Sequence, residues 1–242
     1  MLEGRRVVVV GGSAGIGQAV AQAARAAGAE VAIVGRDAGT LSRAIAALGG
    51  GTRGEAADAR DPAAIATALA KIGRFDHLVV TASASAARLG VAKPMAEMPK
   101  AAAESFFAGK FWAQYHAAQA ALPLLSADGS ITFTSGVASR KGLPNHTVLA
   151  ASNAAVDAMA RQLAREIAPI RVNVVSPGLT DTRAYDHLAA EEKKAFFAHV
   201  TGRLPVARAA SAAEIAQGYI FAMTATYLTG AVLDLDGGLL VT

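Results

Sequence analysis

A glycine-rich turn occupies residues 10–17, with the sequence Val10-Gly11-Gly12-Ser13-Ala14-Gly15-Ile16-Gly17. The apolar, β-branched run Val7–Val10 leads into it and predicts a buried strand, and the alanine-rich segment 17–27 follows it with helical spacing. A glycine motif between a strand and a helix is far more specific than the same glycines elsewhere in a chain. Residues 7–36 are therefore predicted to form a unit that binds the pyrophosphate of a dinucleotide.

Each glycine of the turn has its own role in this prediction. Gly11 permits the tight turn, Gly15 lets the backbone approach a phosphate, and Gly17 lets the helix pack on the sheet. The free N–H groups and the positive dipole end of a helix that begins near Gly15 would bind the phosphates. Ser13 and Ile16 belong to the same turn and are predicted to contact the cofactor with the glycines. A glycine turn without a ligand is the alternative.

The end of the second predicted strand reads Val34-Gly35-Arg36-Asp37 and bears on the choice of nicotinamide cofactor. An acidic residue there would bond the ribose 2′-hydroxyl of NAD and repel the 2′-phosphate of NADP. The expected acidic position holds Gly35, and Arg36 can offer charge-assisted hydrogen bonds to a phosphate. Asp37 is predicted to cap the helix that follows. The sequence favours NADP(H) over NAD(H).

Strand-like and helix-like segments alternate along the whole chain. With 242 residues, of which 53% are apolar, the chain can bury one large core. The alternation predicts an α/β protein: a single Rossmann-fold domain over residues 1–242, with a doubly wound parallel sheet of about seven strands flanked by helices. The apolar runs are 7–10, 31–34, 78–80, 131–133, 172–175 and 232–235, and the helical segments include 17–27, 41–48, 62–72 and 151–167.

Composition argues against several classes of protein. The chain has no cysteine, so disulfides, thiolate metal sites and a cysteine nucleophile are excluded. The net charge of +4 comes from 23 basic and 19 acidic residues that are scattered, and only 5% of residues are aromatic, which argues against nucleic acid binding. No apolar run is long enough to span a membrane, and no acidic or histidine cluster has metal-ligand spacing. The prediction is a cytoplasmic, soluble protein without a metal.

One segment, Leu179–Ala209, breaks the alternation. Thr180 and Thr182 lie near its start, and an amphipathic piece, Glu191–Val200, follows them. In an open α/β sheet, ligands bind beyond the carboxyl ends of the strands, and this segment follows such an end. We therefore expect residues 179–209 to form a mobile lid over a small-molecule substrate.

These motifs together resemble the short-chain dehydrogenase/reductase family, along essentially all 242 residues. The turn is similar to the family's TGxxxGIG, with Val10 in place of its Thr. Asp58, in Ala57-Asp58-Ala59, resembles the Asp that the family places beside the adenine ring. Ala82 lies in Val80-Thr81-Ala82-Ser83, where the family has NNAG. The resemblance implies that Asp58 and Ala82 contact the cofactor.

The second half of the chain resembles the family in the same order. Pro177 and Gly178 are similar to its PG motif on the nicotinamide side of the cofactor, and Thr180 and Thr182 stand where its cofactor-binding threonines lie. The close of the chain resembles its TG and DGG motifs. The resemblance also implies a symmetric homo-oligomer, a tetramer or a dimer, and the apolar segment 231–241 is predicted to pack across a two-fold axis.

The positions that carry the family's chemistry are different here. The family has a Ser that polarises the carbonyl, a Tyr that passes the proton and a Lys that lowers the pKa of the Tyr. Aligning Ala150–Val156 with its YxASKAAV puts Leu149 at the Tyr, Asn153 at the Lys and Gly136 at the Ser. Leucine cannot exchange a proton and asparagine has no charge to stabilise a phenolate, so the ordinary mechanism is not open to this chain.

Four polar residues are candidates to replace the missing groups. Lys110, which stands where the family has a helix Asn, would point toward the vacated Lys position, unless it is a surface lysine with a buried stem. His146 is a candidate general acid, unless it belongs to a helix-start loop. Ser135 would bond a substrate oxygen or the nicotinamide amide, unless the backbone satisfies it. Asn153 would bond a ribose hydroxyl of the cofactor.

Two hypotheses of function follow from these residues. The first is an NADP(H)-dependent oxidoreductase that acts on a carbonyl or alcohol by a non-standard proton path, because hydride transfer is the cofactor's own chemistry. The second is a catalytically inactive NADP(H)-binding sensor or partner subunit. A lyase or isomerase that uses the same fold is a third possibility, because a fold does not fix a reaction.

Overall fold

The central feature of the fold is a parallel sheet of seven strands, in the order β3-β2-β1-β4-β5-β6-β9. It comes from a computed structural model, which describes residues 1–242. The predicted parallel sheet of about seven strands is confirmed. The strands are β1 Arg6–Val10, β2 Glu30–Gly35, β3 Arg53–Ala56, β4 Phe75–Val80, β5 Leu125–Thr134, β6 Arg171–Pro177 and β9 Val232–Leu235.

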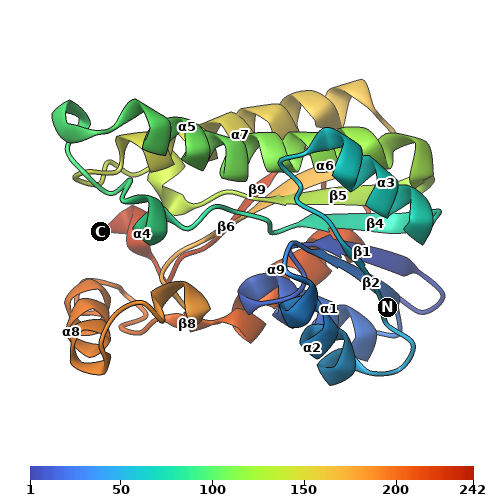
Figure 1. Cartoon of the computed structure of the whole chain (residues 1–242), viewed down its shortest axis with the longest axis horizontal. Helices are drawn as coiled ribbons and strands as arrows, with labels where there is room; N and C mark the ends of the chain where they lie inside the picture. Colours follow the sequence, from blue (N-terminus) through green and yellow to red (C-terminus); the bar gives the residue numbers. More distant parts are fainter.

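Helices cover both faces of the sheet (Figure 1). One layer consists of α1, α2 and α9, and the other contains α3, α6 and α7. Helix layers on both faces are expected for a doubly wound sheet, because the crossover helices of its two halves lie on opposite faces. The helices are α1 Gly15–Ala26, α2 Ala38–Leu48, α3 Pro62–Ile72, α4 Ala86–Leu89, α5 Lys100–Phe107, α6 Ala113–Ala121, α7 Thr147–Glu166, α8 Ala190–Thr201 and α9 Ala212–Thr224.

Strand residues supply the two hydrophobic cores alternately. Val8 and Val10 pack into the core under α3, α6 and α7, whereas Val7 and Val9 pack into the core under α1, α2 and α9. All four of these valines are buried, because successive side chains of a strand point to opposite faces and both faces are covered. None of the helices is both long and apolar enough to cross a lipid bilayer.

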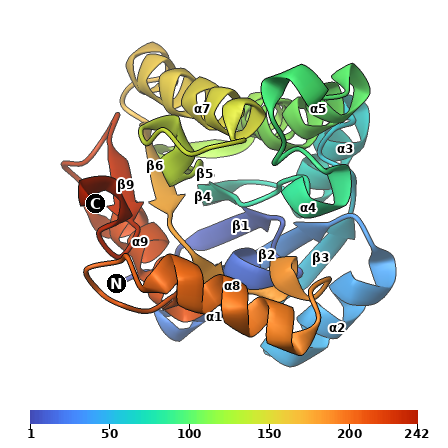
Figure 2. The ribbon, with the colours of Figure 1, turned by 90° about the vertical axis from the view of Figure 1, so that its left-hand side faces the viewer.

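Strand order reverses between β1 and β4, which are neighbours in the sheet although β2 and β3 lie between them in sequence. A doubly wound sheet binds its ligand beyond the carboxyl ends of the strands at such a reversal. The glycine-rich turn leaves β1 at this point. Figure 2 shows α4 on one side of β1 and α8 on the other.

Some elements differ from the sequence prediction at their ends. The helix α7 begins at Thr147 rather than Ala151, and α2 begins at Ala38, with Asp37 as its N-cap accepting a 2.7 Å hydrogen bond from the Thr40 N–H. Both helices begin earlier than predicted because their first turns lack the apolar spacing of a helix interior. The strand β3 was not among the apolar runs, because an edge strand of sequence RGEA carries little apolar surface.

Candidate active site

The turn after β1 has the geometry that a phosphate site requires. Gly11 and Gly15 have positive φ angles of 90° and 54°. Ala14 stands at the N-cap of α1 and gives it no side-chain cap. The N–H groups of Gly15, Ile16 and Gly17 have no acceptor in the protein. The first turn of α1 therefore offers free donors and a positive dipole end to an anion.

Close packing explains why these positions carry no side chain. A Cβ at Gly11 would lie 2.7 Å from the backbone N of Ala82, and a Cβ at Gly17 would overlap the Gly11 carbonyl. Around Gly15 the space is open, with the Thr182 Cβ as the nearest atom at 3.8 Å from an added Cβ. The turn, Ala82 and Thr182 thus come together around one space, although they are far apart in sequence.

The end of β2 combines a glycine, Gly35, with a basic residue, Arg36. A Cβ at Gly35 would lie 2.8 Å from the Ser13 Oγ, so a larger residue there would displace Ser13. Arg36 follows, and its side chain is exposed without an ion pair. Hydrogen bonds from Arg60, at 3.0 and 3.1 Å from its Nε, lower the pKa of Asp58 at the end of β3, with a smaller contribution from Arg36.

The end of β6 closes the other half of the space. A Cβ at Gly178 would lie 2.6 Å from the Cα of Asp236, so the PG segment packs directly on the chain after β9. Thr180 is buried and its Oγ1 donates to the Gly178 carbonyl at 3.1 Å. Because β6 and β2 stand on opposite sides of β1 in the sheet, Pro177 and Gly178 at the end of β6 lie across the glycine-rich turn from Arg36.

A buried lysine lies at the end of β5. Lys110 is 5% exposed, and its Nζ donates a 3.0 Å hydrogen bond to the carbonyl oxygen of Ser135. Burial lowers the pKa of Lys110 to about 8, and the negative charge of Asp157 partly opposes this shift. The alternative of a surface lysine is thus contradicted by the structure.

Two unpartnered polar atoms lie in the same region. Ser135 and Asn153 are both buried, and neither the Ser135 Oγ nor the Asn153 Oδ1 has a hydrogen-bond partner in the protein. Asn153 faces Gly136, since a Cβ on that glycine would lie 3.0 Å from the Asn153 Nδ2. A buried polar atom without a partner costs free energy, so a ligand or water is the expected partner.

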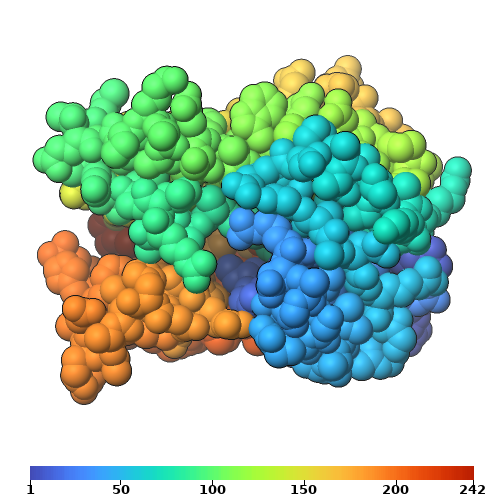
Figure 3. All heavy atoms as spheres, viewed as in Figure 1, coloured from blue at the N-terminus to red at the C-terminus, as the bar shows by residue number.

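The segment 179–209, which the sequence predicts to be a lid, follows the carboxyl end of β6. It contains the short strand β7 (Thr180–Asp181) and the helix α8, and it is followed by the strand β8 (Ala210–Ser211), which pairs with β7. Lys193 holds α8 to β7 through a 2.8 Å ion pair with Asp181. In Figure 3 a hollow separates the orange lid from the green segment above it, and dark blue atoms of the N-terminal part of the chain are visible inside.

Comparison with known proteins identifies the family. A family profile described as enoyl-(acyl carrier protein) reductase matches residues 10–240. The chain belongs to the short-chain dehydrogenase/reductase family of oxidoreductases. It is 32% identical to the short-chain dehydrogenase/reductase ucsE of Acremonium sp, over 99% of this chain and 97% of that protein. It is 30% identical to the L-xylulose reductase of Bos taurus, over 100% of this chain and 98% of that protein.

A solved structure of the same family supports the fold in detail. It is described as a small-chain dehydrogenase in complex with NADPH, and it is 34% identical to this chain. The match covers 98% of this chain and 99% of the chain of that structure, with a TM-score of 0.82. The predicted membership of the short-chain dehydrogenase/reductase family and the Rossmann fold are thereby confirmed.

None of the four tyrosines of this chain belongs to α7, the helix that carries Leu149. Tyr219 is buried beneath β5 and shares a 2.6 Å hydrogen bond with Thr134. Tyr185 belongs to the lid, and burial raises its pKa. Tyr115 and Tyr227 are exposed at the surface. No group of three or more His, Asp or Glu side chains is arranged to hold a metal ion.

His146 lies where the loop before α7 meets the helix. It is the N-cap residue of α7, does not cap the helix with its side chain, and its Nδ1 lies 2.5 Å from the Pro144 carbonyl oxygen. This placement agrees with the alternative of a helix-start loop.

Gln114 contributes to the site but was not singled out by sequence. It is fully buried, and its Nε2 donates at 2.9 Å both to the carbonyl of Lys110 and to the carbonyl of Thr134. Its Oε1 accepts from the Thr134 N–H at 2.9 Å. A glutamine within an alanine-rich helix gives no signal of this role, because the contact depends on how the helix packs against β5.

Proposed function

We propose that this chain is an NADP(H)-dependent oxidoreductase that interconverts a carbonyl and an alcohol by a proton path other than the family's. The observation that carries the proposal is the anion site at the switch point, where the first amides of α1 have no acceptor and Arg36 is free. A pyrophosphate supplies the acceptors that these donors lack, and a 2′-phosphate supplies a partner for the guanidinium.

The residues at the site fit such a cofactor along its whole length. Gly11, Ser13, Gly15, Ile16 and Gly17 would hold the pyrophosphate. The adenine end would lie against Arg36 and Asp58, and the nicotinamide end against Ala82, Pro177, Gly178, Thr180 and Thr182. The cofactor would supply hydride transfer at its nicotinamide ring, and the protein would orient the carbonyl and provide the proton.

Preference for NADP(H) rests on Gly35 and Arg36. An acidic side chain at residue 35 would repel a 2′-phosphate, and the glycine removes that repulsion. The solved relative described as an NADPH complex is consistent with this preference.

Calorimetry with matched variants tests the cofactor preference. Replacing Arg36 by leucine is expected to weaken NADPH binding about 10- to 100-fold, the loss of one charge-assisted phosphate contact, and to leave NADH binding within about 2-fold. Arg74→Leu is the control, because Arg74 is exposed at the amino end of β4, on the opposite edge of the sheet. Equal weakening of NADPH and NADH by Arg36→Leu would contradict the assignment.

Turnover is tested by following NADPH oxidation with a panel of carbonyl compounds. The panel includes ketoses and β-ketoacyl thioesters, since relatives are named L-xylulose reductase and 3-oxoacyl-[acyl-carrier-protein] reductase. Cofactor binding without turnover on any compound would instead favour the inactive sensor or partner subunit.

The lid and the assembly complete the proposal. We propose that residues 179–209 close over the substrate, with Tyr185, Phe196 and Phe197 as an aromatic cluster whose ring centroids lie 5.1–5.9 Å apart. We further propose a homo-oligomer, a tetramer or a dimer, in which segment 231–241 contributes contacts around the edge strand β9. Light scattering after size exclusion tests the assembly, and a monomer would contradict it.

A further inference from the structure

The helix that carries Lys110 is not a regular α-helix. Between α5 and α6 lies a π-helical turn, η2, over Ala108–Trp112, and Lys110 is its central residue. Turns of this type are rare and are found often at functional sites. The turn packs against α7, which carries Asn153 and Asp157. It is from this turn that Lys110 reaches the end of β5.

Gln114 fixes the turn to the sheet. It donates to the Lys110 carbonyl and is bonded to both backbone groups of Thr134, the last residue of β5. Ser135, whose carbonyl accepts from the Lys110 Nζ, is the next residue. The backbone of Lys110 is therefore linked to Thr134 through Gln114, and its ammonium group is bonded to the next residue, Ser135.

The ammonium group of Lys110 has more N–H donors than acceptors in the protein. Lys110 Nζ has three N–H donors, and the Ser135 carbonyl is its one acceptor in the protein. Two donors thus remain, in a place where the Ser135 Oγ and the Asn153 Oδ1 are also buried without partners. Such a concentration of unsatisfied groups is costly unless a ligand completes their hydrogen bonds.

One charged residue has a clear effect on the pKa of Lys110. Asp157 on α7 is the acidic group that acts on it. One carboxylate oxygen of Asp157 accepts from Arg140 at 2.8 Å, and the other has no partner. Arg140, in the loop after β5, also bonds Ser176 at 3.0 Å and contacts Asp234. Gln114 on α6, Asn153 on α7 and Thr134 on β5 are uncharged, so Asp157 is the charged group that favours the protonated lysine, together with the hydrogen bond to the Ser135 carbonyl.

We propose that Lys110 is the catalytic proton donor for the carbonyl oxygen of the substrate, with Gln114 as its positioning residue. This inference rests on the proposed function and assigns the proton path that it leaves open. Ser135 and Asn153 complete the hydrogen bonds of the bound ligands.

The step balances in atoms and electrons. Bound NADPH would supply the hydride, a proton with two electrons, to the carbonyl carbon of the substrate, with NADP⁺ as the oxidised product. The electron pair of the C=O π bond moves to oxygen, and that oxygen takes a proton from the Lys110 ammonium group. Lys110 becomes a neutral amine and regains its proton from water. A pKa lowered to about 8 by burial suits a group that gives up its proton near neutral pH.

Kinetics of substituted proteins test the role of Lys110. Lys110→Met is expected to lower kcat for carbonyl reduction by about 100- to 10,000-fold, the usual contribution of a general acid, with NADPH affinity within about 3-fold. The wild-type rate is expected to fall as pH rises through about 8, because the donor loses its proton. The control is Lys100→Met on α5, whose side chain is 88% exposed.

Lys110→Arg separates proton donation from charge alone. The arginine keeps a cation at this position but holds its proton at every accessible pH, so we expect it to be as slow as Lys110→Met. Wild-type activity in Lys110→Arg or Lys110→Met would overturn the assignment of Lys110 and leave the proposed function intact. If the wild-type chain reduces no carbonyl compound, both proposals fail together.

An NMR titration gives a readout that does not depend on activity. In protein labelled with ¹³C at lysine Cε, the signal that disappears in Lys110→Met identifies Lys110. Its midpoint is expected near pH 8, below those of exposed lysines at about 10.4. Gln114→Met is expected to move this midpoint, and it is expected to lower kcat more than it changes KM. A Lys110 midpoint at the exposed value would overturn the proposal.

Discussion

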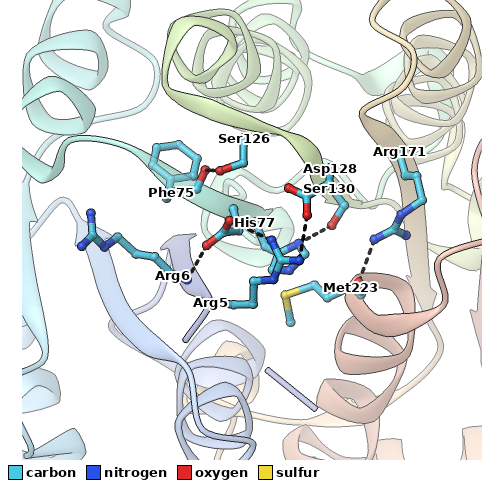
Figure 4. A network of polar contacts seen from close by, with 10 residues as sticks. Arg5, Arg6, Phe75, His77, Ser126, Asp128, Ser130, Arg171 and Met223 are labelled. Atoms are coloured by element: carbon cyan, nitrogen blue, oxygen red, sulfur yellow. Dashed lines mark hydrogen bonds and ion pairs between the residues drawn. The ribbon is translucent and has the colours of Figure 1, made fainter. Parts of the chain in front are cut away.

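Polar groups at the two ends of the parallel strands differ in their pairing. We call the side where the strands begin the amino edge and the side where they end the carboxyl edge. At the amino edge, Arg5 bonds Asp76 at 3.1 Å and Asp128 at 2.7 Å, and the buried His77 shares a 2.9 Å hydrogen bond with Ser130 (Figure 4). Arg171 donates to the carbonyls that end α9. At the carboxyl edge, the first amides of α1, the Ser135 Oγ and the Asn153 Oδ1 have no partner in the protein.

This difference indicates what each edge is for. Polar groups that are paired within the protein hold the strands together, and their hydrogen bonds contribute to the stability of the fold. Polar groups left unpaired lower stability and are retained where they bind or react with something else. Substitutions at the amino edge should therefore change stability and leave cofactor binding alone, and substitutions at the carboxyl edge should do the reverse.

The largest expected effect on stability comes from His77. Burial lowers its pKa from 6.5 to about 4. In that pH range the unfolded chain holds a proton on His77 that the folded chain does not, so the free energy of unfolding falls as the pH falls. The loss amounts to about 3 kcal/mol by pH 4, at roughly 1.4 kcal/mol per unit of pKa.

Urea unfolding at several pH values measures this loss. His77→Gln is expected to flatten the decline between pH 6.5 and 4, whereas His187→Gln, in the exposed part of the lid, should leave it unchanged. A decline of the same steepness in His77→Gln would show that other groups cause it.

A smaller effect is expected from Asp76. Its side chain is 17% exposed, accepts from the Arg6 N–H at 2.8 Å and pairs with Arg5. Asp76→Ala is expected to lower the free energy of unfolding by about 2 kcal/mol, because it removes two hydrogen bonds to a charged group. Asp128→Ala is the matched control, since Asp128 pairs with the same Arg5 but is 63% exposed, and a loss below about 1 kcal/mol is expected.

Cofactor affinity completes the test of Asp76. The NADPH dissociation constant of Asp76→Ala should equal that of the wild type when both proteins are folded. A large change in affinity would contradict the division between the two edges of the sheet.

The smallest effect on stability is expected from Ser135→Ala. The Ser135 Oγ has no partner to lose, so the free energy of unfolding should change by less than about 0.5 kcal/mol. Thermal and urea unfolding of the cofactor-free protein measure it. A loss of more than about 1 kcal/mol would reveal a structural hydrogen bond of Ser135. It would contradict the claim that unpaired polar groups at the carboxyl edge do not stabilise the fold.

Much of the fold follows from the sequence because local patterns specify it. The turn at residues 10–17 and the valine runs predict β1, the start of α1 and the parallel sheet directly. The edge strand β3 was not evident, because its Arg53 and Glu55 resemble loop residues. Its place is set by pairing with β2, which is a long-range contact.

The site is less predictable than the fold for the same reason. The positions that we propose to bind the cofactor follow short motifs, so they could be proposed from the sequence alone. The burial of Lys110 and the contacts of Gln114 depend on how the helix packs against β5 and α7, which no local pattern records. Sequence left Lys110 open between a surface residue and a site residue, and packing decides that it is buried.

The π-helical turn at Ala108–Trp112 has a consequence for how such a site originates. A π turn closes its hydrogen bond one residue later than an α turn, so it contains one additional residue. Each residue advances a helix by about 100°, and the turn therefore rotates everything on one side of it relative to the other. Inserting or deleting a single codon here would change which side chain faces the end of β5. At such a turn, the side chain that faces the strand end depends on the rotation of the helix as well as on the residue type.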